Sequence, residues 1–221
     1  MVTTAGPRRP STLAPVTGAV ESRQERKRRT RQSLLDAALR LLADSSLAGL
    51  SLREVTREAG IVPTAFYRHF ASMDELGVAL AEESMRTLRT MLRDARQKPA
   101  DDAIKGSVAT LVAQVRKHEP HFRFLVRERY GGAAEVRRAI AAELRLLGSE
   151  LATDLGRFPG MATWSSDDLR MAADLMVGAM LSIVMALLDV GDHPDDLAQV
   201  IGVAERQLRM IALGMAHWHP R

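Results

Sequence analysis

The chain has 221 residues, of which 46% are hydrophobic and 26% charged, so it can bury a sizeable core and is not an intrinsically disordered protein. It contains no cysteine, which excludes disulfides, cysteine nucleophiles and cysteine-based zinc sites and fits a reducing cytoplasm. The net charge is +4, but residues 1–70 hold 12 Lys or Arg against 6 acidic residues, a balance of +6 that indicates a nucleic-acid-binding end joined to a near-neutral body.

The first 22 residues contain many Pro, Gly, Thr and Ala residues and lack hydrophobic periodicity, which predicts a disordered tail over residues 1–22. This tail has no apolar run followed by a cleavage pattern, so we expect no signal peptide. The most apolar run, residues 175–188, is 14 residues long, whereas a membrane-spanning helix needs roughly 17 to 25. We therefore expect a cytoplasmic protein that does not associate with membranes.

Apolar residues recur at helical spacing over residues 34–42, directly after a basic run, and predict the first helix. A second, short helix follows. Ser51 is its expected N-cap, Glu54 stands three residues later at the capping-box position, and Gly60 ends the helix. Together with the next helix, these elements form a first domain over residues 23–71.

Pro63 favours the first turn of a third helix over residues 63–70, because a missing N–H has no consequence there. Ser72 and Glu75 form another expected capping box, which starts a long helix that ends near residue 97. Further helices are predicted over residues 104–117, 120–130, 134–158, 165–189 and 194–217. No segment alternates as a strand would, so the predicted fold is all-α with about nine helices, and residues 72–221 form a larger second domain.

Residues 51–70 have the proportions of a helix-turn-helix, two short helices separated by a tight Gly turn. Phe66 and Phe70 are four residues apart, so they share a helix face and are expected in the core. The exposed rim, where a major groove would present phosphates and base edges, then consists of Pro63, Thr64, Ala65, Tyr67, Arg68 and His69. Such spacing also arises by chance, and a basic run alone is more often a solvated helix start. The helix-turn-helix spacing, the basic run and the concentration of positive charge in residues 1–70 together favour a DNA-binding function.

The stretch LREVTREAGIVPTAFYRHFASMDEL, residues 52–76, resembles the DNA-binding domain of the TetR family of bacterial transcription regulators. The shared features are an Arg in the second helix, an Ala-Gly turn and a recognition helix that ends in Tyr-x-His-Phe. The resemblance implies that Ser51, Arg53, Tyr67 and His69 contact phosphates, that Thr64 and Ala65 meet bases, and that Arg68 reaches either. Met73 stands where the family commonly has a phosphate-binding Lys, which puts that contact in doubt.

Together with this domain, the stretch FRFLVRERYGG, residues 122–132, is similar to a subgroup of the family that controls unsaturated fatty-acid synthesis and senses long-chain acyl-CoA, the FabR and DesT regulators. This resemblance implies a repressor with a palindromic operator and an acyl-CoA effector. The expected effector-binding residues are Phe122, Leu125 and Val126 along the chain, Arg127 and Arg129 near the cavity mouth, and the flexible Met176 and Met180. Ordinary core packing for the methionines and ion pairs for the arginines are the alternatives.

The last two predicted helices are candidates for a homodimer interface. Residues 174–190 are apolar around nearly the whole circumference, with Gly178, Ala179 and Ser182 small enough for close helix approach, and residues 197–218 carry a broad apolar face. One monomer would struggle to cover both helices, although an intramolecular core is the alternative. A dimer would also span two half-sites of a palindrome.

Other classes of protein fit the sequence less well. His118 and His121 could suggest a metal pair, but Pro120 lies between them and no third ligand is evident. The Gly131-Gly132 pair lacks the Gly-Lys-Ser/Thr of a phosphate loop. We therefore expect no enzyme, no metal and no cofactor. Two alternatives stay open: a regulator of efflux or catabolism that senses another apolar ligand, and a basic lipid- or acyl-binding protein that does not bind DNA.

Overall fold

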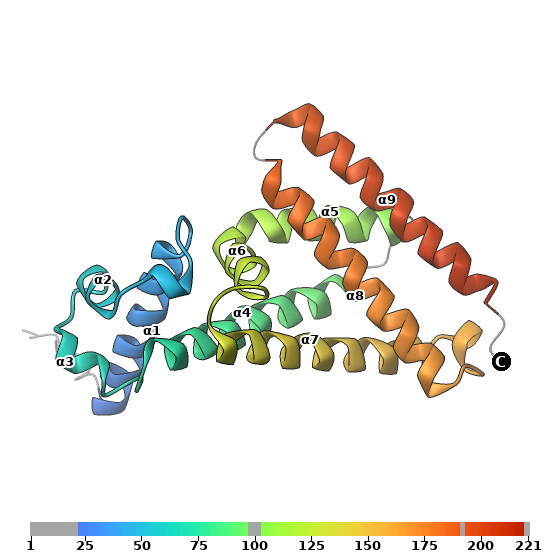
Figure 1. The fold of residues 1–221 in the computed structure, drawn as a ribbon. Helices are drawn as coiled ribbons and strands as arrows, with labels where there is room; N and C mark the ends of the chain where they lie inside the picture. Colours follow the sequence, from blue (N-terminus) through green and yellow to red (C-terminus); the bar gives the residue numbers. More distant parts are fainter. Residues whose placement is uncertain (1–21, 97–102, 191–192, 219–221) are drawn as a thin grey trace, which may run out of the picture.

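The computed structural model describes residues 22–96, 103–190 and 193–218 (Figure 1). Within these residues the chain forms nine α-helices and two short 3-10 helices and contains no strand, which confirms the predicted all-α fold. The predicted disordered tail lies outside the described residues, apart from Ser22, which caps the first helix.

The N-terminal domain is a small bundle at one end of the molecule (Figure 1). It comprises α1 (Arg23–Leu41), the 3-10 helix η1 (Leu47–Gly49), α2 (Leu52–Glu58) and α3 (Pro63–Phe66). The predicted third helix extends to residue 70, but the α-helix ends at Phe66. The amides of Arg68 and His69 bond three residues back, to Ala65 and Phe66, so the chain continues in tighter turns.

Of the two predicted capping boxes, the one at α2 is complete and the one at α4 is half formed. The Ser51 hydroxyl accepts the Glu54 N–H, and the Glu54 carboxylate accepts the Ser51 N–H at 2.9 Å, so the box at α2 is complete. At the next helix the Ser72 hydroxyl accepts the Glu75 N–H at 3.1 Å, but the Glu75 carboxylate binds the Ala71 N–H instead of that of Ser72. This second box is therefore only half formed.

The remaining helices build the larger body. They are α4 (Met73–Arg96), α5 (Ala103–Lys117), α6 (Glu119–Glu128), α7 (Ala134–Leu155), α8 (Ser166–Asp189) and α9 (Pro194–Ala216), with a 3-10 turn η2 (Pro159–Met161) after α7. The helix ends agree with the predicted ends within a few residues. The helix α4 runs from the N-terminal domain into the body alongside α7, and α8 crosses the body next to α9 (Figure 1).

Among the described helices, α8 alone has the length and apolarity of a membrane span, with a mean hydropathy of 2.1 over 18 residues. Length and composition do not distinguish a span from a packed helix of a globular body, and α8 packs against both α7 and α9. Only 28% of its most apolar window is buried inside the chain. Much of the apolar surface of α8 is therefore uncovered in a single copy.

Candidate nucleic-acid interface and effector cavity

A sharp turn between α2 and α3 sets the direction of the short third helix. Gly60 has a φ of +69°, in the left-handed region that glycine enters without strain, as the Gly turn predicted. The Ile61 amide then bonds back to the Thr56 carbonyl at 2.9 Å, which closes the turn. Val62 leads into α3 in an extended conformation, and Pro63 occupies the first turn. The turn thus presents α3 at the outer end of the domain.

Two phenylalanines hold α3 against the domain. Phe66 and Phe70 are 0% and 1% exposed, and their ring centroids lie 5.7 Å apart, so the predicted core positions are confirmed. Tyr67 packs edge-on against Phe66, also at 5.7 Å, while 64% of its surface stays exposed. The apolar side of the segment is therefore anchored, and its other side is open.

The predicted DNA-binding residues lie on α3, in the turn that follows it and at the start of α2, with different exposures. Pro63, Thr64, Tyr67 and Arg68 are exposed, whereas Ala65 and His69 are half-buried. Ser51 and Arg53 are exposed at the start of α2, but the Ser51 hydroxyl also donates to the Glu54 carboxylate at 2.6 Å. That bond must be shared or exchanged if Ser51 binds a phosphate.

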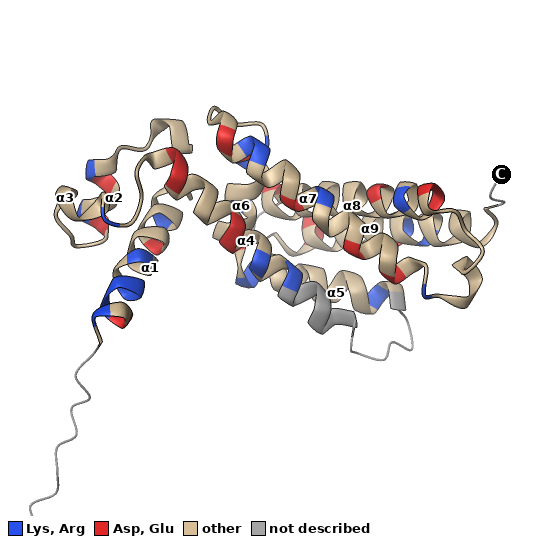
Figure 2. Cartoon of the chain, turned by 90° about the horizontal axis from the view of Figure 1, so that it is seen from below, with Lys and Arg blue, Asp and Glu red and all other residues tan. Residues whose placement is uncertain are grey.

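The basic part of α1 lies beside the end of α3. The Arg31 guanidinium lies 4.9 Å from the centre of the Phe70 ring. Burial lowers the pKa of His69, and the positive charges of Lys27, Arg31 and Arg68 lower this pKa further. In Figure 2 the Lys and Arg positions, coloured blue on the cartoon, are concentrated along the N-terminal half of α1, at the same end of the molecule as α3. The rim of α3 and the cationic side of α1 therefore form one surface suited to phosphates.

Val62 belongs to this rim but is absent from the predicted set. It is 64% exposed and stands directly before Pro63 as the N-cap residue of α3. An exposed apolar residue directly before a helix-opening proline can be noticed in the sequence, but its exposure is not set by the local pattern.

An apolar cavity lies in the body, between α4, α5, α6, α7 and α8. Its lining comprises Met85, Leu88, Leu111, Phe122, Leu125, Val126, Arg129, Ile140, Leu144, Leu147, Val177, Met180, Leu181 and Val184. Arg129 is the one charged side chain among these, and its guanidinium lies 5.3 Å from the ring centre of Tyr130, which is 74% exposed. The cavity therefore has an apolar interior and one cation at its edge.

Five of the seven predicted effector residues line this cavity, namely Phe122, Leu125, Val126, Arg129 and Met180. Arg127 does not: its guanidinium binds backbone carbonyls at the end of α1, at 3.1 Å for Leu42. Met176 packs instead on a separate cluster formed by Leu155, Ala172 and Ala173. These two residues therefore lie outside the cavity. For Arg127 the structure shows neither of the two predicted roles, a place at the cavity mouth or an ion pair, because its guanidinium binds backbone carbonyls.

The two histidines considered as a metal pair lie near each other at the start of α6. The ring centres of His118 and His121 are 6.2 Å apart, and His121 Nδ1 lies 2.9 Å from the Ser84 hydroxyl. Burial lowers the pKa of His121, an effect that Glu83 partly offsets. Within the described residues no group of three His, Asp or Glu side chains could hold a metal ion.

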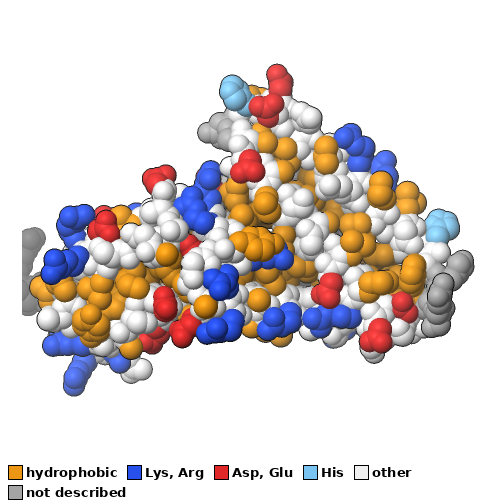
Figure 3. All heavy atoms as spheres, in the orientation of Figure 1, with side chains coloured by type: hydrophobic (Ala, Val, Ile, Leu, Met, Phe, Trp, Pro, Cys, Tyr) orange, Lys and Arg blue, Asp and Glu red, His pale blue; other side chains and the backbone are white. Residues whose placement is uncertain are grey.

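The outer side of α8 carries a regular stripe of uncovered residues. Met171, Leu175 and Met185 are 49%, 58% and 44% exposed, and the small Gly178 and Ser182 between them are exposed too. Their spacing alternates between four and three residues, which is the seam spacing of packed helix pairs. On α9, Met210 and Leu213 are 75% and 56% exposed. Figure 3 shows apolar side chains gathered over these two helices.

Family comparisons agree with this arrangement. Residues 34–80 match the family described as bacterial regulatory proteins, tetR family, and residues 100–214 match the tetracyclin repressor-like C-terminal domain. The chain belongs to the TetR family. TetR-family proteins are DNA-binding transcription regulators, so the helix-turn-helix assignment and the DNA partner are confirmed at that level.

Several solved structures share the fold. The fatty acid degradation regulator FadR from Bacillus halodurans is 13% identical, with a TM-score of 0.65 over 87% of this chain and 97% of that one. FadR from Bacillus subtilis, solved with stearoyl-CoA, is 16% identical, with a TM-score of 0.63 over 83% and 98%. The multidrug binding protein EbrR, solved with imidazole, is 21% identical, with a TM-score of 0.54 over 80% and 93%. At these identities the likeness concerns the fold.

Proposed function

We propose that the protein is a cytoplasmic, homodimeric TetR-family repressor whose affinity for a palindromic operator is changed by a long-chain acyl-CoA, in control of fatty-acid synthesis or desaturation, as the likeness to the FabR and DesT subgroup implies. In this proposal residues 23–71 bind DNA, and residues 72–221 bind the effector and the second copy. The observation that carries the proposal is the apolar cavity with Arg129 at its edge. An acyl chain and an anionic head group have the matching chemistry.

The proposed DNA contacts follow the rim of α3. Ser51, Arg53, Tyr67 and His69 would bind phosphates, with Arg68 able to reach a phosphate or a base. Pro63, Thr64 and Ala65 would lie against base edges, where methyl groups favour thymine. Since phosphate contacts release counterions, operator affinity should fall steeply as salt rises.

An acyl chain could enter the cavity only if the cavity became larger. Its volume of about 30 Å³ is space for roughly one or two water molecules, so an acyl chain requires the lining side chains to move. Met85 and Met180 are unbranched and can change rotamer readily. A ligand that binds only the opened cavity shifts the protein toward that conformation, and operator affinity changes if the two conformations differ in DNA affinity.

The stripe on α8 supports the homodimer. A second copy placed about a two-fold axis would cover Leu175 and Met210, and the small Gly178 and Ser182 would allow close helix approach. Two recognition helices would then meet two half-sites of a palindrome.

The effector test measures the dissociation constant of the protein for a selected operator duplex, with stearoyl-CoA, oleoyl-CoA, CoA alone or no addition. We expect acyl-CoA to change the constant by about 5- to 150-fold and CoA alone to leave it unchanged. Leu125→Trp, which fills the cavity from a position 7% exposed, should abolish the response and keep operator binding. Leu146→Trp, 46% exposed on α7, is the matched control. No response to either acyl-CoA would refute the acyl-CoA assignment.

A second candidate is a regulator of efflux or catabolism that senses another apolar ligand. One feature of the cavity lining favours this candidate. Arg129 is the one charged residue in the lining, whereas CoA carries several phosphates that would need cationic partners. A response to apolar drugs but not to acyl-CoA would support this candidate.

A further inference from the structure

Val62 is an exposed apolar residue at the entry to α3. Its side chain is 64% exposed, whereas the preceding Ile61, which is also β-branched, is half-buried and packs against the core of the chain. The backbone at Val62 is extended, with a φ of −76° and a ψ of 145°, and successive side chains of an extended backbone point to opposite sides. Ile61 therefore faces the core, and Val62 faces outward.

The stability of the domain does not depend on a valine at this position. Val62 is the N-cap residue of α3, and its side chain makes no capping hydrogen bond. Pro63 already restricts the residue before it to an extended backbone, so a β-branched side chain is not required for that conformation. A serine would adopt the same backbone, and its hydroxyl could accept the N–H of Thr64 or Ala65, as serine does at many N-caps. The valine therefore contributes little to folding that a capping residue would not exceed.

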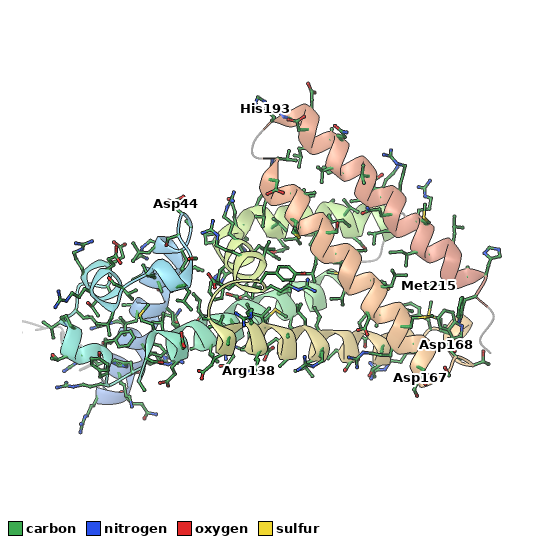
Figure 4. The ribbon with its side chains drawn as sticks, viewed as in Figure 1. Asp44, Arg138, Asp167, Asp168, His193 and Met215 are labelled. Atoms are coloured by element: carbon green, nitrogen blue, oxygen red, sulfur yellow. The ribbon has the colours of Figure 1, made fainter. Side chains whose placement is uncertain are left out.

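The position of Val62 in the fold leaves its side chain accessible from outside the molecule. The helix α3 lies at the outer end of the N-terminal domain, away from α5 to α9 (Figure 1). The loop that follows α1, where Asp44 is labelled in Figure 4, lies at the other end of the same domain. The proposed dimer surface on α8 and α9 is likewise remote from α3 in both ribbon views.

The neighbours of Val62 are suited to a DNA groove. Pro63 and Thr64, which follow it, are exposed. Tyr67 and Arg68 are exposed further along the same short segment. In helix-turn-helix proteins the N-terminal residues of the recognition helix contact base edges in the major groove. Val62 therefore stands at the end of α3 that would lie closest to the bases.

The chemistry of the side chain indicates which base it would select. The C5-methyl of thymine is the apolar group that the major groove presents, and the other bases present hydrogen-bond donors and acceptors there. A valine offers no hydrogen bond, so contact with those polar groups would leave them unpartnered. Its branched side chain has a restricted χ1, so it loses little rotamer freedom when it packs against a methyl group.

We propose that Val62 is a specificity-determining residue, which selects a thymine in each half-site of the operator by packing against the C5-methyl group of that base. The inference rests on the DNA-binding part of the proposed function and is independent of the acyl-CoA assignment.

The test is a double-mutant cycle between the protein and an operator duplex selected from a random library. Each thymine is replaced in turn, in both half-sites, by deoxyuridine, which lacks only the C5-methyl group. Fluorescence anisotropy then gives the dissociation constants without any acyl-CoA. For the parent we expect one position where this replacement weakens binding about fourfold per half-site, or about 15-fold for both, as for one buried methyl group. In Val62→Ser the factor should fall below about twofold, and the effects at other thymines should not change.

The matched control is Val62→Ile, which keeps a β-branched apolar side chain and should keep the parental preference for thymine over deoxyuridine. Urea unfolding checks the fold. Because the side chain is 64% exposed, Val62→Ser should keep the parental urea midpoint, or raise it through an N-cap hydrogen bond. If Val62→Ser does not fold, Val62→Ala replaces it, with the same expected loss of preference.

An equal effect of deoxyuridine in Val62→Ser and in the parent would overturn the proposal, as would a parent that binds its operator but responds to the loss of no thymine methyl group. Failure of the parent to enrich any duplex would overturn both this proposal and the DNA-binding part of the proposed function. If stearoyl-CoA leaves operator affinity unchanged, the acyl-CoA assignment fails and the thymine contact stands.

Discussion

Removing one hydroxyl group from the rim of α3 should weaken DNA binding without changing the fold. In Tyr67→Phe the ring keeps its edge-on contact with Phe66 at 5.7 Å, and the side chain is 64% exposed. We therefore expect the free energy of unfolding to change by less than about 0.5 kcal/mol. A hydrogen bond to a charged phosphate contributes about 1.5–3 kcal/mol, so each half-site should lose roughly 10- to 100-fold in affinity.

Fluorescence anisotropy with labelled operator and with random duplex measures this loss, and urea unfolding measures stability. The loss should be similar on both duplexes, because phosphate contacts carry no sequence information. The neighbouring Phe66→Ala is the contrasting variant: Phe66 is 0% exposed, so its truncation should lower the free energy of unfolding by about 3–5 kcal/mol. Parental DNA affinity in Tyr67→Phe, or a loss confined to the operator, would refute this account of the rim.

Three further predictions concern the turn, the dimer and pH. Gly60→Ala should lower the free energy of unfolding by about 1–2 kcal/mol in urea titrations, because alanine is strained at a φ of +69°. No atom lies near the added methyl group, so the loss would come from the backbone conformation alone, and unchanged stability would contradict this. Leu175→Glu should halve the mass in solution and weaken operator binding, whereas Leu175→Met should stay dimeric; a dimeric Leu175→Glu would count against the α8 interface. Burial lowers the pKa of His121 below its usual 6.5, so the unfolded chain binds more protons and thermal stability should fall as pH drops from about 7.5 to 5.5. His121→Asn should lose less stability over that range, and an equal loss would exclude His121 as a contributor.

Features set by local chemistry could be predicted from the sequence. The capping box of Ser51 and Glu54 depends on residues three apart, and the left-handed Gly60 depends on one residue. The burial of Phe66 and Phe70 follows from helical spacing. The end of α3 was placed too late, because nothing in local propensity distinguishes an α-helical turn from the tighter turn that follows Phe66.

Features set by distant partners could not be predicted in the same way. Arg127 binds carbonyls more than eighty positions earlier in the chain, and periodicity says only that it is exposed, not what it reaches. Met176 and Met180 are one turn apart on α8, but the cavity ends between them. The lining from α4 and α7, such as Met85 and Ile140, has the same pattern as ordinary core residues. Which of these residues line the cavity depends on how the helices pack against one another, and a single sequence does not show this.

Selection of duplexes from a random library, followed by binding measurements at two salt concentrations, tests most directly whether the dimer presents two α3 rims to DNA. We predict enrichment of a palindrome with half-site centres about one helical turn, roughly 10 base pairs, apart, and affinity that falls steeply between low and high salt. Failure to enrich any sequence, or binding to anionic vesicles as tight as to the enriched duplex, would contradict the account.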